Sequence, residues 1–117
     1  MTISSSVLDH LREIVGTVHT EENDRQAYGL DWTRFYEPSP AAVVFPRSTN
    51  EVSDIVKLAN AHGFALVPSG GRTGLSGGAV ARNDEVVVSF DKMNRILDFN
   101  EIDRSVLVEA GVVTQAL

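Results

Sequence analysis

The sequence predicts an α+β domain with a small parallel sheet, on three observations. Two short apolar runs, residues 42–45 and 64–67, each lead directly into a proline. Between them, residues 52–62 carry apolar side chains at helical spacing, which is typical of a helix with one buried face. Ser48 opens a capping box before this helix, and Gly63 suits its C-terminal end. A strand, a helix and a strand joined by short connections form a βαβ unit, whose two strands run parallel.

The N-terminal third predicts a helix and a lead-in. Serines at N-cap positions precede apolar residues at helical spacing, which predicts an amphipathic helix over residues 4–18. His10 and His19 are expected to be solvated helix positions rather than metal ligands, because no acidic or cysteine partners stand at metal spacing around them. Residues 20–25 are polar and predict a loop or a short helical turn. The aromatic stretch 28–36 is expected to pack rather than to stack on bases, since no basic density accompanies it.

The C-terminal part predicts further strands. Residues 85–90 are apolar enough for a third strand, and residues 105–109 alternate as a fourth. Between them, residues 91–95 predict a turn that leads into a return segment. Residues 114–117 are typical of an N-cap followed by the first turn of a helix.

Composition narrows the class of protein. The chain has 117 residues, a formal net charge of −6 and no cysteine. This length allows one domain with a modest core. An acidic chain without a basic cluster argues against nucleic acids and anionic membranes as partners. The sequence also lacks a signal peptide pattern and an apolar stretch of about 20 residues, so we expect no transmembrane segment. The absence of cysteine fits a reducing compartment, and we expect a cytoplasmic protein.

A glycine-rich loop over residues 68–78 is the strongest functional signal. Five of the nine glycines of the chain lie in it, with three hydroxyl side chains, one cation and no carboxylate. Glycine lets backbone N–H groups approach a ligand closely, and successive N–H groups can form a nest for an anion. This composition fits a phosphate or a pyrophosphate.

The common phosphate motifs do not describe this loop. Neither the G-x-G-x-x-G fingerprint nor the G-x-x-x-x-G-K-[ST] pattern is present, and the loop leads towards a strand rather than directly into a helix. The loop and Pro46 each follow the carboxyl end of a predicted parallel strand. Because ligands of parallel sheets lie off these ends, we expect both features at one edge of the sheet.

The run 42–46, the pair Glu51-Val52 and the run 67–78 together resemble the flavin domain of the vanillyl-alcohol-oxidase/PCMH superfamily. Within it, the likeness is strongest to the FAD-linked oxidase branch that contains D-lactate dehydrogenase, D-2-hydroxyglutarate dehydrogenase and the glycolate oxidase FAD subunit. Residues 91–96 and 108–112 fit the same branch.

The resemblance implies a PCMH-type FAD-binding domain. Residues 1–37 would be an N-terminal helix and lead-in, and residues 38–117 the incomplete first part of the domain. The first subdomain would hold the βαβ-containing parallel sheet, and the second would be truncated. We expect the chain to be the N-terminal piece of a longer protein, because it stops inside a predicted helix.

The resemblance also assigns cofactor contacts. Residues 69–75 would wrap the FAD diphosphate, Gly77 and Gly78 would close the loop, and Pro46 would lie near the adenosine end. The expected cofactor-binding residues are Pro46, Pro68, Ser69, Gly70, Gly71, Arg72, Thr73, Gly74, Leu75, Ser76, Gly77 and Gly78. No metal ligand is assigned, and catalytic residues are expected beyond Leu117.

The implied activity is that of a flavin-dependent oxidoreductase. The full-length enzyme would oxidise a small 2-hydroxy acid of the D-lactate, glycolate or D-2-hydroxyglutarate type, with an unknown electron acceptor, and this piece alone would be inactive. Some members of the superfamily attach FAD through a histidine in an S-G-G-H pattern. Here that position is Arg72, and the chain has no cysteine. This departure implies non-covalent FAD, with Arg72 contributing to phosphate binding.

Other interpretations remain open from the residues alone. The loop could belong to a stand-alone nucleotide- or anion-binding module without catalysis, to a small interaction domain, or to a flexible linker. As alternatives to a cofactor contact, Pro68 could serve merely to end its strand, and Leu75 could fill the core beneath the loop. Arg72 could be a solvated charge. His62 is expected to be a helix-end residue.

Overall fold

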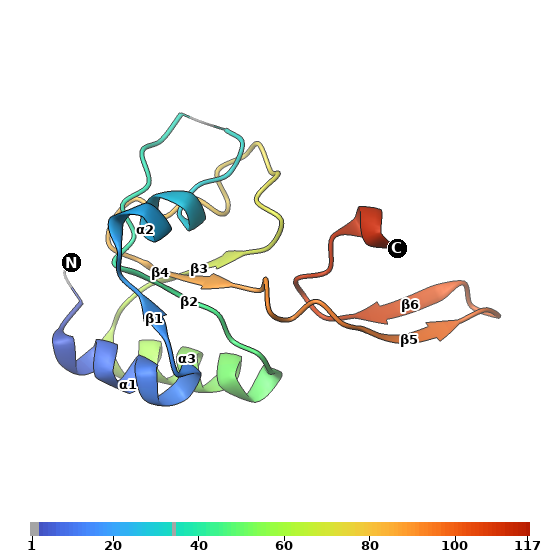
Figure 1. Ribbon diagram of the computed structural model, residues 1–117, viewed down its shortest axis with the longest axis horizontal. Helices are drawn as coiled ribbons and strands as arrows, with labels where there is room; N and C mark the ends of the chain where they lie inside the picture. The colour runs from blue at the N-terminus through green and yellow to red at the C-terminus, as the bar shows by residue number, and fades with distance from the viewer. Residues whose placement is uncertain (1–2, 34) are drawn as a thin grey trace.

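The computed structural model describes residues 3–33 and 35–117. Its elements are α1 (Ser5–Val15), β1 (Val18–His19), α2 (Glu22–Tyr28), β2 (Ala42–Val44), α3 (Thr49–His62), β3 (Leu66–Ser69), β4 (Val86–Ser89), β5 (Ile96–Asn100), β6 (Ser105–Val108) and the 3₁₀ turn η1 (Thr114–Ala116). Figure 1 shows two parts: a layered α/β body and a hairpin that projects from it. The predicted α+β class with a small parallel sheet is confirmed.

The body is a four-stranded sheet in the order β1-β2-β4-β3. β2, β4 and β3 run parallel, with Val43 opposite Val87 and Val67 opposite Val87 on the other side. The predicted βαβ strands, β2 and β3, are therefore parallel but not adjacent, because β4 lies between them. β1 joins the far edge antiparallel to β2.

Alternating side chains of the parallel strands give the sheet two buried faces. Ala42 and Val44 point to the face covered by α1 and α3, where Leu11 and Ile55 are fully buried. Val43 and its neighbours point to the opposite face, which α2 covers, as Figure 1 shows. Strands buried on both faces read as continuous apolar runs, which explains why the sequence signal was strong.

The predicted caps of α3 are confirmed. The Ser48 hydroxyl accepts a hydrogen bond from the Glu51 N–H at 3.2 Å, and the Glu51 carboxylate accepts one from the Arg47 N–H at 2.6 Å. Gly63 closes the helix in the left-handed region at φ 72°, with its N–H bonded to the Ala59 carbonyl. Such a conformation favours glycine, as predicted.

The N-terminal helix is shorter than predicted. It ends at Val15, because Gly16 adopts φ 80° and donates its N–H to the Arg12 carbonyl. The following residues enter the sheet as β1. His19 is thus a strand residue and not a solvated helix position: its Nδ1 lies 3.1 Å from an Asp24 carboxylate oxygen, and its ring packs edge-on against Phe45.

Other boundaries also differ from the sequence predictions. Pro68 does not end its strand: β3 runs through it to Ser69, pairing Pro68 with Val88. An edge strand tolerates proline because the missing N–H would face away from the sheet. The structure has a helix, α2, over Glu22–Tyr28, which is longer than the loop or short helical turn expected over residues 20–25. At the C-terminal end, Val113 caps η1 without a side-chain hydrogen bond, so Thr114 is not the predicted N-cap.

The hairpin β5–β6 forms a separate antiparallel sheet. Gly111 lies at its base, where a Cβ would come within 1.8 Å of the Phe90 carbonyl oxygen, so only glycine fits there. Glu109 also closes the base, since its carboxylate accepts hydrogen bonds from the Arg95 N–H at 2.9 Å and from Arg95 Nε at 2.8 Å. These bonds, together with the Arg95 charge, lower the pKa of Glu109.

Candidate functional site

The carboxyl ends of the three parallel strands meet at one edge of the sheet, as expected. The glycine loop leaves β3 after Ser69, Phe45 and Pro46 follow β2, and Asp91 follows β4. Side chains connect these ends: Lys92 Nζ lies 5.5 Å from the centre of the Phe45 ring. The glycine loop and Pro46 therefore start from the same edge of the sheet.

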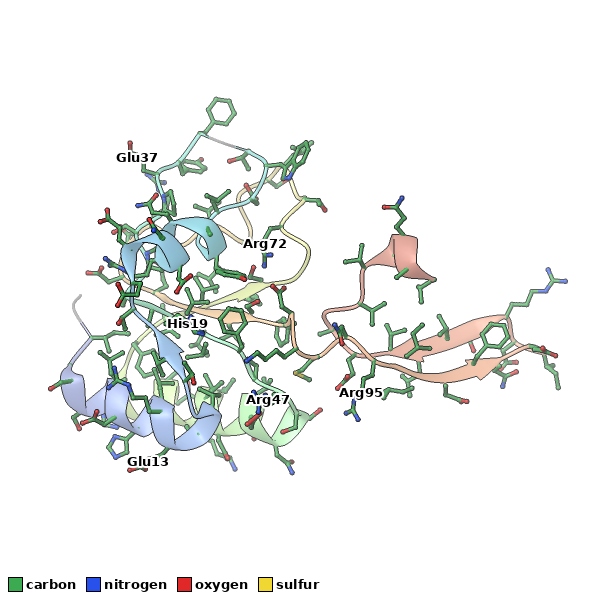
Figure 2. The ribbon with its side chains drawn as sticks, viewed as in Figure 1. Glu13, His19, Glu37, Arg47, Arg72 and Arg95 are labelled. Atoms are coloured by element: carbon green, nitrogen blue, oxygen red, sulfur yellow. The ribbon has the colours of Figure 1, made fainter. Side chains whose placement is uncertain are left out.

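Arg72 holds the start of the glycine loop, next to β3, in place. Its Nη1 donates to Asp91 Oδ1 and to the Gly70 carbonyl, each at 3.3 Å. Its guanidinium carbon lies 4.6 Å from the centre of the Tyr28 ring. Figure 2 shows the side chain on the inner side of the loop, towards the sheet. The alternative that Arg72 is a solvated charge is wrong, because an ion pair and an aromatic face hold it.

Asp31 holds the other end of the glycine loop, at Gly77, in place. This carboxylate is only 2% exposed; its Oδ2 accepts from the Gly77 N–H at 3.0 Å and its Oδ1 from the Thr33 N–H at 2.8 Å. The Trp32 N–H donates to the Gly74 carbonyl at 3.0 Å, so residues 31–33 run beside the loop. Asp31 was not predicted from the loop's own composition, which contains no carboxylate, because this partner comes from a distant segment.

The middle of the loop keeps its donors free. Within the described part of the chain, the backbone N–H groups of residues 70–76 donate to no other protein group. A Cβ built on Gly70, Gly71 or Gly78 would meet nothing within 4 Å, so their Cα faces border open space. Free amides flanked by bare Cα atoms let an anion approach the backbone, which is what a phosphate site requires.

The need for a positive φ angle does not account for the presence of most glycines in this loop. Among the loop glycines described, only Gly77 has a positive φ, at 79°. Arg72 itself adopts φ 58°, in the left-handed region that L-residues rarely enter. The glycines at 70, 71, 74 and 78 are therefore not required by a left-handed backbone.

A cavity of about 270 Å³ lies beside the loop, lined by Gly71, Thr73, Val112, Val113, Thr114 and Gln115. Sequence analysis did not place residues 112–115 at the site, because their position depends on how the chain returns from the hairpin. A larger cavity of about 490 Å³ lies by Ser48, Arg95 and Glu109, away from the glycine loop. The smaller cavity is the better candidate, because it adjoins the free amides.

Other predicted contacts occupy different environments. Pro46 is fully buried, whereas Pro68 is exposed on β3. Leu75 is 74% exposed, so the alternative that it plugs the core is wrong. Within the aromatic stretch, Tyr28 packs edge-on against Phe45 as predicted, whereas Trp32 is 59% exposed and Phe35 is 89% exposed. Apolar side chains of both segments therefore lie at the surface around the loop.

Residues 3–33 and 35–117 contain neither a metal-binding cluster nor a helix that could span a membrane. No cluster of three or more His, Cys, Asp or Glu side chains could hold a metal ion there. Over the same residues, no helix combines the length and the apolar character that a membrane crossing requires.

Residues 40–117 match the family described as FAD binding domain. The chain belongs to this family. Among curated relatives of this FAD-binding domain, D-2-hydroxyglutarate dehydrogenase of Stutzerimonas stutzeri (strain A1501) is 55% identical over 96% of the chain, and glycolate oxidase subunit GlcD of Bacillus subtilis (strain 168) is 32% identical over 96%. The chain spans about a quarter of the length of each relative, 25% and 24% respectively.

Solved structures confirm the PCMH-type fold. A p-cresol methylhydroxylase structure with substrate bound matches 92% of the chain and 22% of its own length, with a TM-score of 0.79 at 23% identity. A 4-ethylphenol oxidase from Gulosibacter chungangensis matches 94% of the chain and 23% of its own length, with a TM-score of 0.76 at 30% identity. The predicted resemblance to this superfamily is confirmed, and the curated relatives bear two of the names that the sequence resemblance gave, D-2-hydroxyglutarate dehydrogenase and glycolate oxidase subunit.

Proposed function

We propose that the glycine loop holds the diphosphate of a non-covalent FAD, in an oxidoreductase that acts on a small 2-hydroxy acid. The observation that supports this most is the row of free N–H groups at 70–76, beside glycines whose Cα faces are open. Such donors fit the oxygen atoms of a diphosphate. The family match supplies the cofactor class, and the names of the relatives supply the substrate class.

Each group of residues would contact a different part of the cofactor. Residues 69–75 would surround the diphosphate, Gly77 and Gly78 would close the loop, and Pro46 would stand near the adenosine end. Arg72 would contribute charge at one side of the loop while it remains paired with Asp91. When bound, the flavin supplies the redox chemistry by accepting a hydride from the substrate. The chain's own contribution is binding and orientation.

Non-covalent attachment follows from side-chain chemistry. Arg72 stands where some relatives of the superfamily have a histidine, and the chain has no histidine after His62 and no cysteine. A guanidinium stays protonated and offers no lone pair for attack on the flavin. Acid precipitation of the full-length protein should therefore leave yellow colour in the supernatant. Flavin that stays in the pellet and maps to a residue of this chain would contradict the proposal.

The 2-hydroxy acid activity is tested by anaerobic mixing. The flavin absorbance of the full-length protein should bleach with D-2-hydroxyglutarate, glycolate or D-lactate. A yellow protein that none of them reduces would refute the substrate class. A colourless protein that still binds ADP would favour the alternative, a nucleotide-binding module without catalysis, which the free amides alone would also support. The cytoplasmic location stays a prediction that cell fractionation can test.

A further inference from the structure

We propose that Asp31 is a positioning residue of the glycine loop, which keeps the N–H groups of residues 70–76 available to a diphosphate. The proposal rests on the FAD-binding function above. It goes further because it assigns a role to a carboxylate outside the loop, in the segment between α2 and β2.

The first step is geometric. Both oxygens of Asp31 accept backbone N–H groups, from Gly77 at 3.0 Å and from Thr33 at 2.8 Å. A Cβ on Gly74 would lie 3.8 Å from Oδ2, so the carboxylate also borders the loop from beneath. The contact joins residues 46 positions apart in the chain. Asp31 therefore ties the Gly77 end of the loop to the body of the domain.

The second step is electrostatic. A buried carboxylate beside an anion site would repel a diphosphate, and burying a charge is costly unless it is hydrogen-bonded. Here both oxygens are occupied by backbone donors, and bonds to a charged acceptor are about twice as strong as neutral ones. The negative charge of Asp31 is thus engaged by backbone N–H groups of Thr33 and Gly77. Within the loop, it captures one amide, that of Gly77, and leaves the preceding amides free.

The two anchors act at opposite ends of the loop. Arg72, held by Asp91 and Tyr28, anchors the loop near β3. Asp31 anchors it at Gly77. The loop is thus fixed at both ends, and among the described residues the backbone N–H groups of 70–76 donate to no protein group. Fixing donors before the ligand arrives reduces the ordering cost of binding.

Hydrogen exchange on the unaltered full-length protein tests this pattern without a mutation. With the flavin removed, the Gly77 and Thr33 amides should exchange slowly, and the amides of residues 70–76 should exchange fast. Added ADP, which carries the adenosine and the diphosphate of the cofactor but no flavin, should slow exchange at 70–76. A Gly77 amide that exchanges as fast as residues 70–76 would overturn the proposal.

Substitution then tests the consequence for binding. Asp31→Asn keeps the shape but places an amide nitrogen against one backbone donor, so the Gly77 or Thr33 amide should lose protection. FAD and ADP should each bind roughly tenfold more weakly or worse. Asp31→Glu, which keeps the charge, should recover part of the affinity. Asp54→Asn, an exposed position on α3, is the matched control and should bind normally.

The outcomes separate the two proposals. If the unaltered protein binds neither FAD nor ADP, the proposed function fails. If it binds both and Asp31→Asn binds equally well, the proposed function stands and the role of Asp31 is refuted. If Asp31→Asn does not fold, the exchange pattern of the unaltered protein still decides the question.

Discussion

Replacing Gly71 by valine should separate flavin binding from folding. The new Cβ would meet no protein atom within 4 Å, and Gly71 is not among the glycines with positive φ. Valine at this position therefore brings neither a clash of its Cβ nor a strained positive φ. A surface substitution without such features changes the free energy of unfolding by about 0.5 kcal/mol or less. The apo protein should melt almost unchanged.

The effect on binding should be much larger. The two methyl groups would occupy the space from which a diphosphate reaches the free amides. Loss of two hydrogen bonds to a charged group, at about 1.5–3 kcal/mol each, corresponds to roughly a hundredfold to ten-thousandfold weaker binding. The assay is FAD content by absorbance after purification, followed by titration of the apo protein.

Ala65→Val is the matched control, since it adds the same two methyl groups at an exposed position outside the loop. It should load FAD fully. If Gly71→Val also purifies with a full complement of FAD and titrates with normal affinity, the diphosphate does not lie against this loop and the site assignment is wrong.

Three further substitutions test other contacts. Arg72→Met should weaken FAD binding by roughly threefold to tenfold, consistent with an ion pair of about 1 kcal/mol or less and a similar cation–π contact; a double-mutant cycle with Asp91→Asn should show coupling. The pKa of Glu109 is lowered by its hydrogen bonds to Arg95, so the stability from this pair is present above the ordinary pKa near 4.5 and is lost as pH falls through the lowered value. Glu109→Gln should flatten this part of the acid-unfolding profile, and an unchanged profile would contradict the assignment. Gly111→Ala should lower the free energy of unfolding by about 3 kcal/mol or more, because its Cβ meets backbone rather than a movable side chain; thermal melting measures this, and an unshifted melting temperature would show that the hairpin base relaxes freely.

Local patterns in the sequence predicted local structure well. The Ser48 cap and the left-handed Gly63 depend on interactions within a few residues, and both are present. The extent of β3 was not predictable in the same way. Whether a strand continues through Pro68 depends on its being at a sheet edge, and that depends on where β4 inserts.

The site was predictable in place but not in detail. Glycine content and the strand ends located the loop. The two carboxylates that position it, Asp31 and Asp91, come from segments before and after it, and no spacing rule connects them to Arg72 or Gly77. The exposure of Trp32 and Phe35 was also missed, because an aromatic stretch alone does not reveal how much of each ring the rest of the fold covers.

The central place of β4 has a consequence for the order of folding. β2 and β3 precede it in the chain but cannot pair with each other, since each pairs with β4. During synthesis, the parallel sheet must therefore wait until residues 86–89 have left the ribosome, and the glycine loop lacks its Arg72–Asp91 anchor until then. Contacts of high sequence separation form slowly, so we expect cofactor capture to be a late event in biogenesis. Protease sensitivity of nascent chains, arrested before or after Val86, would report this step directly.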